Sequence, residues 1–435
     1  MPRSCVLGLL DRARIFVVVL AAVPLVACGG TEPPFPDLGR SEFEAPSTLA
    51  KPLSWLRRFA IDRFLDYRVL RGKRAGFVAL VAREGRVVYA RTTGFADVEA
   101  RVPMSLDTRF HIASMTKPIT AVAALMLVDD GKLSLDDPVS DYVPAFAEAV
   151  VASARDANGS FSTRPLETPL TVRHLLTFTS GIGGYAETDD PLDRLWRSPD
   201  VELAGLGSLA DRIEIVTRRP LYETPGTRWR YGLSADVLAR VVEVAAGEPF
   251  DAFLRRRLFE PLGMTATGFP DQQPPGAPWA RMYTHAEDGS LVLEPGFDAY
   301  YGRGWTPGGG GLVSTAGDFM RFALMLWNGG RWDGVRFLAP ETAEAMTRLQ
   351  VQSGVLADMG LAGLGWGFGV SVVADDRVTR MRANDGDYWW SGRFGTHFWV
   401  SPATDTVVVL MQQTESGPYS DLPVDGPLVQ ALALP

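Results

Sequence analysis

A serine and a lysine in the stretch FHIASMTKPIT have the types and spacing of a nucleophile and its base. At a spacing of three residues in a helix, Ser114 and Lys117 project from one face. A serine hydroxyl attacks a carbonyl carbon efficiently only when another group takes its proton. A buried lysine can lose its charge and do this, whereas arginine cannot because its pKa is too high. Taken alone, the pair also fits an N-cap serine followed by a surface lysine.

The scarcity of lysine adds weight to the chemical interpretation. The chain has 43 basic residues, and only four of them are lysines, at positions 51, 73, 117 and 132. Most of the positive charge is therefore carried by arginine. A lysine directly after a serine-containing turn is a position where arginine could not act as a base.

A tyrosine and a second serine lie in the stretch PGTRWRYGLSADVLARVV, just before a predicted helix. A phenol held beside a lysine ammonium loses its proton more easily and can shuttle protons. Tyr231 is therefore a candidate third member of the group, with Ser234 beside it. Without Ser114, a tyrosine at this place would more often be a core aromatic residue.

These motifs, in this order, resemble the serine β-lactamase and penicillin-binding-protein superfamily, in which S-x-x-K is followed by Y-x-S or Y-x-N. The layout is most similar to the class C β-lactamase-related branch, with its family VIII carboxylesterases and D-amino-acid peptidases. The resemblance covers about residues 52–432 and rests on five further stretches: TRFHIASMTKPIT, LTVRHLLTFTSGI, PGTRWRYGLSADVLARVVEVAAG, LFEPLGMTATGF and GGGGLVSTAGDFMRFALMLWNGG.

The resemblance implies a role for each matching residue. Ser114 would be the acylated nucleophile, and its backbone N–H would form half of the oxyanion hole. Lys117 and Tyr231 would share the general-base and general-acid work, and Ser234 would be a supporting hydrogen-bonding residue. Which of Lys117 and Tyr231 takes the proton during acylation stays open, since the two can titrate as one coupled unit.

The third family motif, K-T-G or H-T-G, is replaced by Trp390-Ser391-Gly392 in the stretch YWWSGRFGTHFWVSP. The resemblance places the second oxyanion donor at the Arg393 backbone N–H, and glycine at 392 allows a close approach to the strand. Tryptophan in place of lysine favours neutral esters over substrates that carry a carboxylate. The Arg393 side chain is positively charged, so it stays open whether it replaces the charge of the missing lysine. Aromatic residues that either line a pocket or belong to the core are Trp389, Trp390, Tyr185, Tyr300 and Tyr301.

The elements predicted around these motifs indicate an α+β fold. Its antiparallel sheet is built from both chain ends, flanked by helices and interrupted by a mostly helical region. Apolar spacing and turn residues predict a helix over 52–70, a hairpin around residues 84–86, a buried helix over 119–130 that ends at Gly131, and two helices joined at 247–249. Strands are predicted within 367–374, 395–402 and 405–413, and a C-terminal helix over about 425–434.

The N-terminus has the pattern of a bacterial lipoprotein signal. Three arginines precede an apolar run, residues 15–27, that is too short to span a bilayer. The run ends in Leu25-Val26-Ala27-Cys28, which resembles a lipobox whose cysteine is lipidated. We therefore expect a signal peptide over 1–27 and a Pro/Gly-rich tether over 28–50. The expected location is the cell envelope, anchored by Cys28 on the periplasmic side.

The remaining chain, 51–435, is expected to form a single serine hydrolase domain with its helical subdomain over roughly 145–345. A content of 46% hydrophobic and 22% charged residues is typical of a globular domain. The net charge of −8, without a basic run, argues against nucleic-acid binding. The histidines at 111, 174, 285 and 397 have no metal-like spacing, so neither a metal nor another cofactor is expected.

The sequence therefore predicts a serine hydrolase that forms an acyl-enzyme on Ser114, with a small-molecule ester or amide as its substrate. Carboxylesterase activity on small or short-chain esters is favoured by Trp390. A D-amino-acid peptidase or amidase, or a weak β-lactamase, is an alternative within the same chemistry. A non-catalytic envelope protein that binds peptides is an alternative of another class, but it would not need all three of Ser114, Lys117 and Tyr231.

Overall fold

The computed structural model describes residues 52–155, 160–184, 190–197, 207–273, 276, 278–294, 297, 305–352, 362–379, 381–415 and 425–435. The expected signal peptide, the tether and Cys28 lie outside these described residues. Tyr185, Tyr300 and Tyr301 lie outside them as well.

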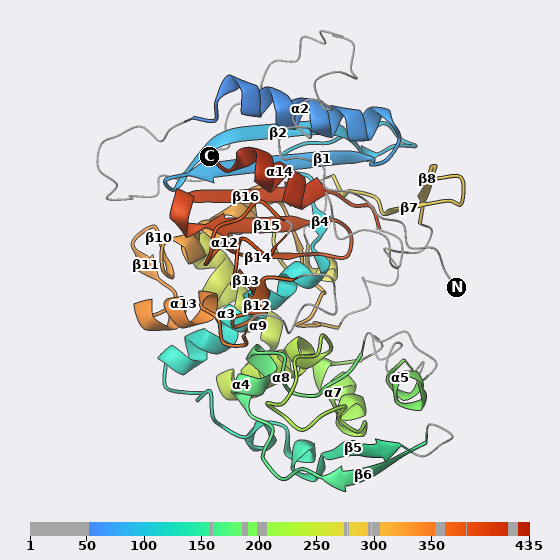
Figure 1. Ribbon diagram of the computed structural model, residues 1–435, viewed down its shortest axis with the longest axis vertical. Helices are drawn as coiled ribbons and strands as arrows, with labels where there is room; N and C mark the ends of the chain where they lie inside the picture. The colour runs from blue at the N-terminus through green and yellow to red at the C-terminus, as the bar shows by residue number, and fades with distance from the viewer. Residues whose placement is uncertain are drawn as a thin grey trace.

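An eight-stranded antiparallel sheet forms the centre of the described structure (Figure 1). Strand β1 pairs with β2 in the predicted hairpin and with β16 from the other end of the chain, from Val78 opposite Met411 to Arg83 opposite Thr406. The predicted sheet from both chain ends is therefore confirmed. Its order is β12 (Leu364–Trp366), β13 (Ser371–Val373), β14 (Tyr388–Ser391), β15 (His397–Ser401), β16 (Thr406–Met411), β1 (Gly76–Arg83), β2 (Arg86–Asp97) and β3 (Val102–Pro103).

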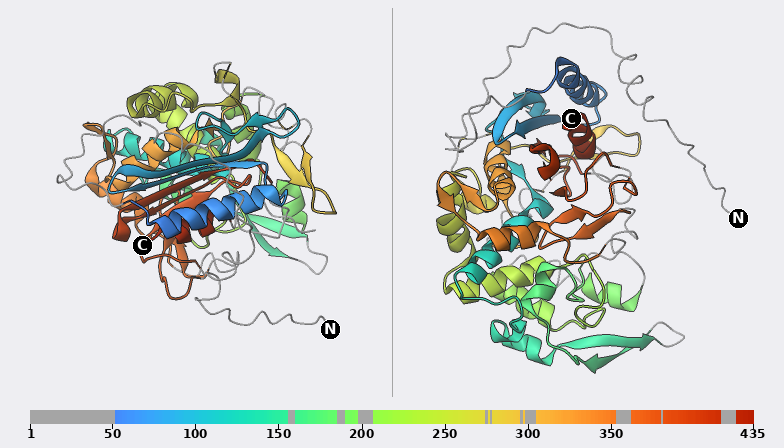
Figure 2. Two further views of the ribbon diagram at one scale, coloured as in Figure 1. Left: turned by 90° about the horizontal axis from the view of Figure 1, so that it is seen from above. Right: turned by 60° about the vertical axis from the view of Figure 1, so that its left-hand side comes forward.

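Helices cover both faces of this sheet (Figures 1 and 2). Adjacent residues of a strand point to opposite faces, and β15 shows which helix covers which face. The Phe398 ring lies 5.2 Å from Phe319 of α12 (Ala316–Trp327). The neighbouring His397 lies directly under Gly426 of α14 (Asp425–Ala433), which packs beside α2 (Trp55–Leu70). Since both faces are covered, β1 can be apolar and buried from Gly76 to Ala82.

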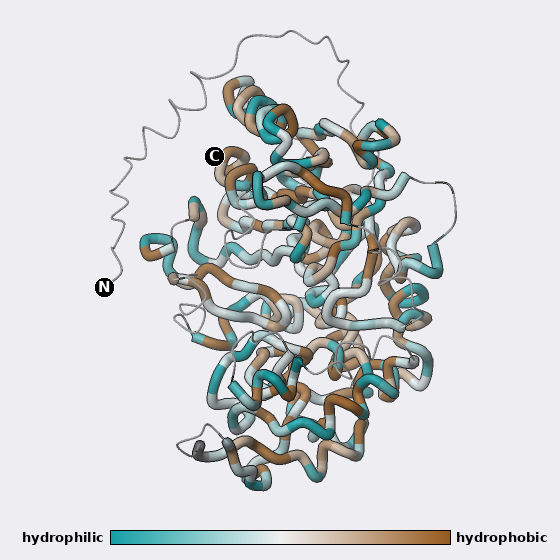
Figure 3. The backbone as a smooth tube through the Cα atoms, turned by 90° about the vertical axis from the view of Figure 1, so that its right-hand side faces the viewer, coloured by the Kyte–Doolittle hydropathy of each residue, from teal (hydrophilic) through white to brown (hydrophobic). Residues whose placement is uncertain are grey.

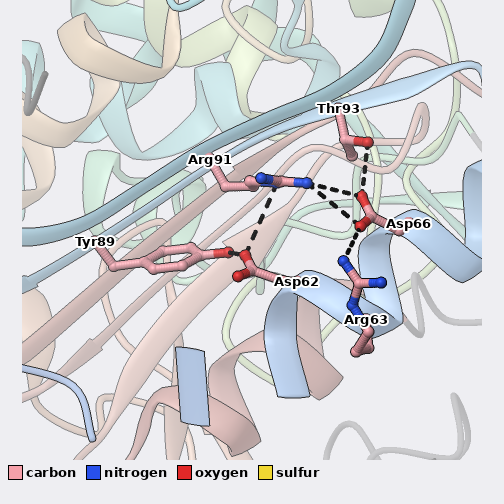
Figure 4. A network of polar contacts seen from close by, with 6 residues as sticks. All are labelled: Asp62, Arg63, Asp66, Tyr89, Arg91 and Thr93. Atoms are coloured by element: carbon pink, nitrogen blue, oxygen red, sulfur yellow. Dashed lines mark hydrogen bonds and ion pairs between the residues drawn. The ribbon is translucent and has the colours of Figure 1, made fainter. Parts of the chain in front are cut away.

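A polar network fixes α2 over β2 (Figure 4). The Tyr89 hydroxyl donates to Asp62 at 2.7 Å, and Arg91 and Thr93 donate to Asp66 at 3.1 and 2.9 Å. Burial raises the pKa of the Asp62 carboxyl, although the hydrogen bond from Tyr89 and the charge of Arg91 oppose this shift. The helix predicted over 52–70 is thus present and anchored by paired charges as well as apolar contacts.

The helical region packs around α3 (Thr116–Asp129) and α8 (Ser234–Ala246) at the other side of the sheet. The predicted buried helix is confirmed in α3, almost all of whose residues are buried. The two helices predicted on either side of 247–249 are α8 and α9 (Phe250–Leu254). Smaller elements of this region are α4 (Val172–Leu176), α5 (Pro191–Trp196), α7 (Leu209–Thr217), α10 (Glu260–Leu262) and α13 (Pro340–Thr347).

Several short strand pairs in the middle of the chain were not predicted. The longest is the hairpin of β5 (Val150–Arg155) and β6 (Phe161–Pro165). The others are β4 (Phe110–His111) with β9 (Val313–Ser314), β7 (Tyr283–His285) with β8 (Leu291–Leu293), and β10 (Arg331–Trp332) with β11 (Val335–Arg336). Two- and three-residue strands are too short to give a period-2 signal. The range 145–345 also contains α12, which packs on the sheet, so the bounds of the inserted helical region stay a prediction.

Apolar and polar residues are interleaved along the described chain (Figure 3), and none of its helices is long and apolar enough to cross a membrane.

Candidate active site

Ser114 lies in a tight turn between a short strand and a buried helix. The 3-10 turn Ala113–Met115 follows β4 and leads directly into α3. Ala113 has a φ of +44°, a conformation that residues other than glycine rarely adopt. The turn is fixed on both sides, because Ile112 donates to the Leu312 carbonyl at 3.0 Å and the His111 N–H donates to the Gln413 side chain at 2.9 Å. Pro118 falls in the first turn of α3, where its missing N–H costs no helical hydrogen bond.

The structure brings Ser114, Lys117 and Tyr231 together, and we call these three residues the Ser–Lys–Tyr trio. The Tyr231 hydroxyl donates to the Ser114 Oγ at 2.7 Å, and the Lys117 Nζ donates to the same oxygen at 3.1 Å. The Lys117 Nζ also lies 4.6 Å from the centre of the Tyr231 ring. The serine oxygen is thus within hydrogen-bond reach of two groups that can exchange protons, as an activated nucleophile requires.

Lys117 is 1% exposed, and a glycine-rich loop holds its amine. The Nζ donates to the Gly309 carbonyl at 2.6 Å, in addition to Ser114. The loop containing Gly308–Gly311 is wedged against α8, since a Cβ on Gly308 would lie 2.3 Å from the Ala235 carbonyl. The structure shows this loop in direct contact with the lysine.

Aromatic rings pack around Tyr231. Its ring centre lies 5.8 Å from Phe178, 6.1 Å from Trp229 and 5.6 Å from Trp390, and Trp366 packs against all three of these neighbours. This packing leaves the phenol few orientations other than the one facing Ser114. Each such pair is worth about 0.5–1.5 kcal/mol beyond its buried area.

The two neighbouring tryptophans of β14 face opposite sides of the sheet. Trp390 is 6% exposed and faces Tyr231, on the side of the trio. Trp389 stacks on Trp399 at 5.5 Å and lies near His397, on the side covered by α14. Of the two, only Trp390 lies beside the trio.

Gly392 lies where β14 meets the turn that carries Ser114. A Cβ at this position would be 2.2 Å from the Thr396 Oγ1 and 2.4 Å from the Ile112 carbonyl oxygen, so a side chain does not fit. From the sequence, we expect a glycine at this position to let a substrate approach the strand closely. In the structure the neighbours of Gly392 are the Thr396 side chain and the Ile112 backbone. This contact places the end of β14, and with it the Arg393 backbone, beside the turn that carries Ser114.

The Arg393 side chain points to solvent and is paired. It is 70% exposed, and its Nε donates to the Glu415 carboxylate at 2.5 Å. An exposed pair of this kind adds little stability, but the opposite charge beside it reduces the field that the guanidinium exerts on a bound substrate. The hypothesis that the Arg393 side chain replaces the charge of the missing K-T-G lysine is therefore weakened.

Ser234 is the first residue of α8, and its hydroxyl is hydrogen-bonded to the Ser180 Oγ at 2.8 Å. Ser180 in turn accepts from the Ile182 N–H at 3.0 Å. Ser234 stands three residues after Tyr231, so Leu233 occupies the place of the second polar residue of Y-x-S or Y-x-N. Its visible contacts thus join α8 to the segment of residues 180–182.

Burial keeps two of the histidines neutral. It lowers the pKa of His111 to about 4 and that of His397 to about 3. The Nδ1 of His397 shares a 2.7 Å hydrogen bond with the Ser391 Oγ, on the sheet face under α14. This serine–histidine pair is therefore separated from the trio by the sheet.

Sequence reasoning missed one charged residue of this region. Asp236, in the first turn of α8, is 2% exposed and accepts a hydrogen bond from the Gly309 backbone N–H. An aspartate at this place in the sequence reads as an ordinary acidic residue of a first helical turn. Only the folded chain shows that it is buried behind Lys117.

Comparisons with known proteins agree with this geometry. The Beta-lactamase family model matches residues 60–430. Esterase EstB of Burkholderia gladioli is 33% identical over 394 residues, covering 86% of this chain and 93% of that protein. Protein Rv1367c of Mycobacterium tuberculosis is 33% identical over 366 residues, covering 79% and 86%. The solved structure of EstCE1, a hydrolase with promiscuous acyltransferase activity, superposes with a TM-score of 0.74 at 27% identity, covering 87% and 98%. The chain belongs to the β-lactamase family and is a serine hydrolase.

Proposed function

We propose that the protein is a carboxylesterase that cleaves small or short-chain esters through an acyl-enzyme on Ser114. The observation that carries the proposal is the position of the Ser114 Oγ, 2.7 Å from the Tyr231 hydroxyl and 3.1 Å from the Lys117 Nζ. The esterase names of two relatives support the ester as the reacting group.

In the acylation step, the Ser114 oxygen attacks the ester carbonyl carbon while its proton passes to the coupled Lys117–Tyr231 pair. The backbone N–H groups of Ser114 and Arg393 would hold the oxyanion. The pair then returns the proton to the departing alkoxide oxygen, and the alcohol leaves. Water enters in its place, loses a proton to the same pair and attacks the acyl carbon. The acid is released when Ser114 regains its proton.

The preference for neutral esters rests on Trp390 and on the Arg393–Glu415 pair. A lysine at position 390 would put a positive charge near a substrate carboxylate, and tryptophan puts an apolar ring there instead. The one arginine of this strand end is balanced by Glu415. Little is therefore left to attract the carboxylate of a β-lactam or of a peptide ending in D-alanine.

The test compares two substrate classes on one enzyme. Residues 29–435, purified without a lipid, should hydrolyse nitrophenyl acetate and butyrate, and Ser114→Ala should lose at least about 10³-fold of this activity because the nucleophile is removed. A chromogenic cephalosporin should be cleaved little or not at all. Strong Ser114-dependent cephalosporin turnover with weak ester turnover would instead favour a β-lactamase.

We also propose that the protein is anchored to the periplasmic side of the cell envelope by a lipid on Cys28. The support is the apolar run that ends in Leu25-Val26-Ala27-Cys28 after three arginines. Cys28→Ser should abolish incorporation of labelled palmitate and move the protein from the membrane fraction to the soluble fraction. Equal labelling of Cys28→Ser and the unchanged protein would contradict the anchor. Cys5→Ser is the matched control and should behave as the unchanged protein.

A further inference from the structure

A buried carboxylate lies directly behind the Ser–Lys–Tyr trio. Asp236 is 2% exposed, and one of its oxygens lies so near Gly309 that a Cβ there would be only 2.5 Å away. The Gly309 N–H donates to this carboxylate. Asp236 also lies at the N-terminal end of α8, where the helix dipole favours a negative charge. Both contacts favour the ionised form of Asp236, although burial opposes them and raises the pKa of this carboxyl.

Gly309 connects Asp236 to Lys117. Its N–H belongs to the peptide group before its Cα and is held by Asp236, whereas its carbonyl belongs to the peptide group after the Cα. That carbonyl accepts from the Lys117 Nζ at 2.6 Å. A glycine is free to rotate about both of its backbone bonds, so a hydrogen bond on each side is what fixes its orientation. The carboxylate thus fixes the carbonyl that orients the lysine.

Two cations face Asp236 from the neighbouring elements. Arg212 of α7 is 7% exposed, and its guanidinium lies 4.4 Å from the centre of the Trp305 ring. Lys117 of α3 is the second. Burial raises the pKa of the Asp236 carboxyl, while the charges of Arg212 and Lys117 and the Gly309 N–H lower it. The network of Asp236, Arg212 and Gly309 therefore joins α7, α8 and the glycine-rich loop around one lysine.

We propose that Asp236 is a positioning residue that orients Lys117 through Gly309 and holds a proton on the Lys117–Tyr231 pair. The proposal builds on the proposed function, because it assigns a role in activating Ser114. A negative charge near an ammonium favours its protonated form, so loss of that charge should let the pair release its proton at lower pH. Loss of the Gly309 contact should also misplace the amine, and small misplacements of a catalytic group cost up to about 10²-fold in rate.

The test measures how fast a fluorophosphonate probe modifies Ser114 as a function of pH, since this reaction needs an activated serine but no ester turnover. Asp236→Asn keeps the size of the side chain and removes its charge. We expect the maximal rate to fall about 10–100-fold, and the acid limb of the profile to move to lower pH by about one unit. Asp318→Asn is the matched control, because Asp318 is also a buried aspartate in the first turn of a helix, bonded to Ala266 and Thr267. It should lower the melting temperature and leave the acid limb in place.

Gly309→Ala separates the orienting role of Asp236 from the effect of its charge on the Lys117–Tyr231 pair. Its Cβ would collide with the Asp236 carboxylate, so the rate should fall while the charge remains and the acid limb moves little. An Asp236→Asn enzyme that is folded and keeps the unchanged acid limb would overturn the proposal, whatever its maximal rate. Should the unchanged protein react with the probe but hydrolyse no ester, the carboxylesterase proposal would fail, and the comparison at Asp236 would still decide this one.

Discussion

Replacement of Lys117 by arginine is expected to lower kcat/KM for a short-chain nitrophenyl ester by about 10³-fold or more. Arginine keeps the positive charge and most of the length, but it cannot give up its proton near neutral pH. The amine of Lys117 touches both the Ser114 Oγ and the Gly309 carbonyl, so its loss removes a proton carrier from the nucleophile. General acid–base groups typically contribute about 10²–10⁴-fold to a rate.

The matched control for this change is Lys132→Arg. Lys132 is exposed in the turn after α3, so the same substitution there should leave kcat/KM within about twofold. Circular dichroism and thermal unfolding of both variants show whether Lys117→Arg is folded. Full activity in a folded Lys117→Arg enzyme would mean that Lys117 is not part of the base.

Removal of the phenol at position 231 is the second change with a large expected effect. Tyr231→Phe keeps the ring between Phe178, Trp229 and Trp390, so the fold and KM should change little. The hydroxyl that donates to the Ser114 Oγ at 2.7 Å is lost, and kcat is expected to fall by about 10²–10³-fold. Steady-state kinetics separate the two parameters.

Tyr142→Phe is the control for the loss of a bonded phenol. The Tyr142 hydroxyl donates to Asp137 at 2.6 Å, outside the trio. Its removal should cost about 1 kcal/mol of unfolding free energy and leave kcat unchanged. If Tyr231→Phe lost stability but kept its kcat, the tyrosine would serve only the packing of the aromatic cluster.

The trio could be predicted because its signals are local. Ser114 and Lys117 are three residues apart, Tyr231 precedes a clear helix, and lysine is rare in this chain, so each residue type carried information. The sheet could be predicted because β1 and β16 are mostly apolar runs at opposite ends of the sequence. Their pairing places both chain ends in one sheet, as expected.

The surroundings of the trio could not be predicted because they depend on contacts between distant segments. The Asp236 carboxylate is bonded to Gly309, which lies 73 residues later, and nothing in the local sequence indicates that the two residues meet. From the sequence, the Arg393 side chain could replace the charge of the K-T-G lysine. The structure places Glu415 beside it, and the opposite charge weakens this interpretation. For Gly392 the sequence predicts that a substrate approaches the strand closely, whereas the proximity of the Ile112 carbonyl follows only from how β14 packs.

The resemblance to the family also carried a detail that this chain does not share. Ser234 was predicted from the Y-x-S pattern, yet it stands one residue too far along, on the buried side of α8 against Ser180. Leu233 is at the position that the pattern assigns to a polar side chain. The structure shows aromatic packing around the Tyr231 ring.

The measurement that tests the central claim most directly is the site of covalent modification. The purified protein is treated with a fluorophosphonate to partial and to full extent, the modified peptide is sequenced by mass spectrometry, and the remaining ester turnover is measured in each sample. We predict modification of Ser114 alone, with turnover lost in proportion to the modified fraction. Turnover that survives complete modification of Ser114, or a proportional loss caused by modification of another residue, would contradict the assignment of Ser114 as the nucleophile.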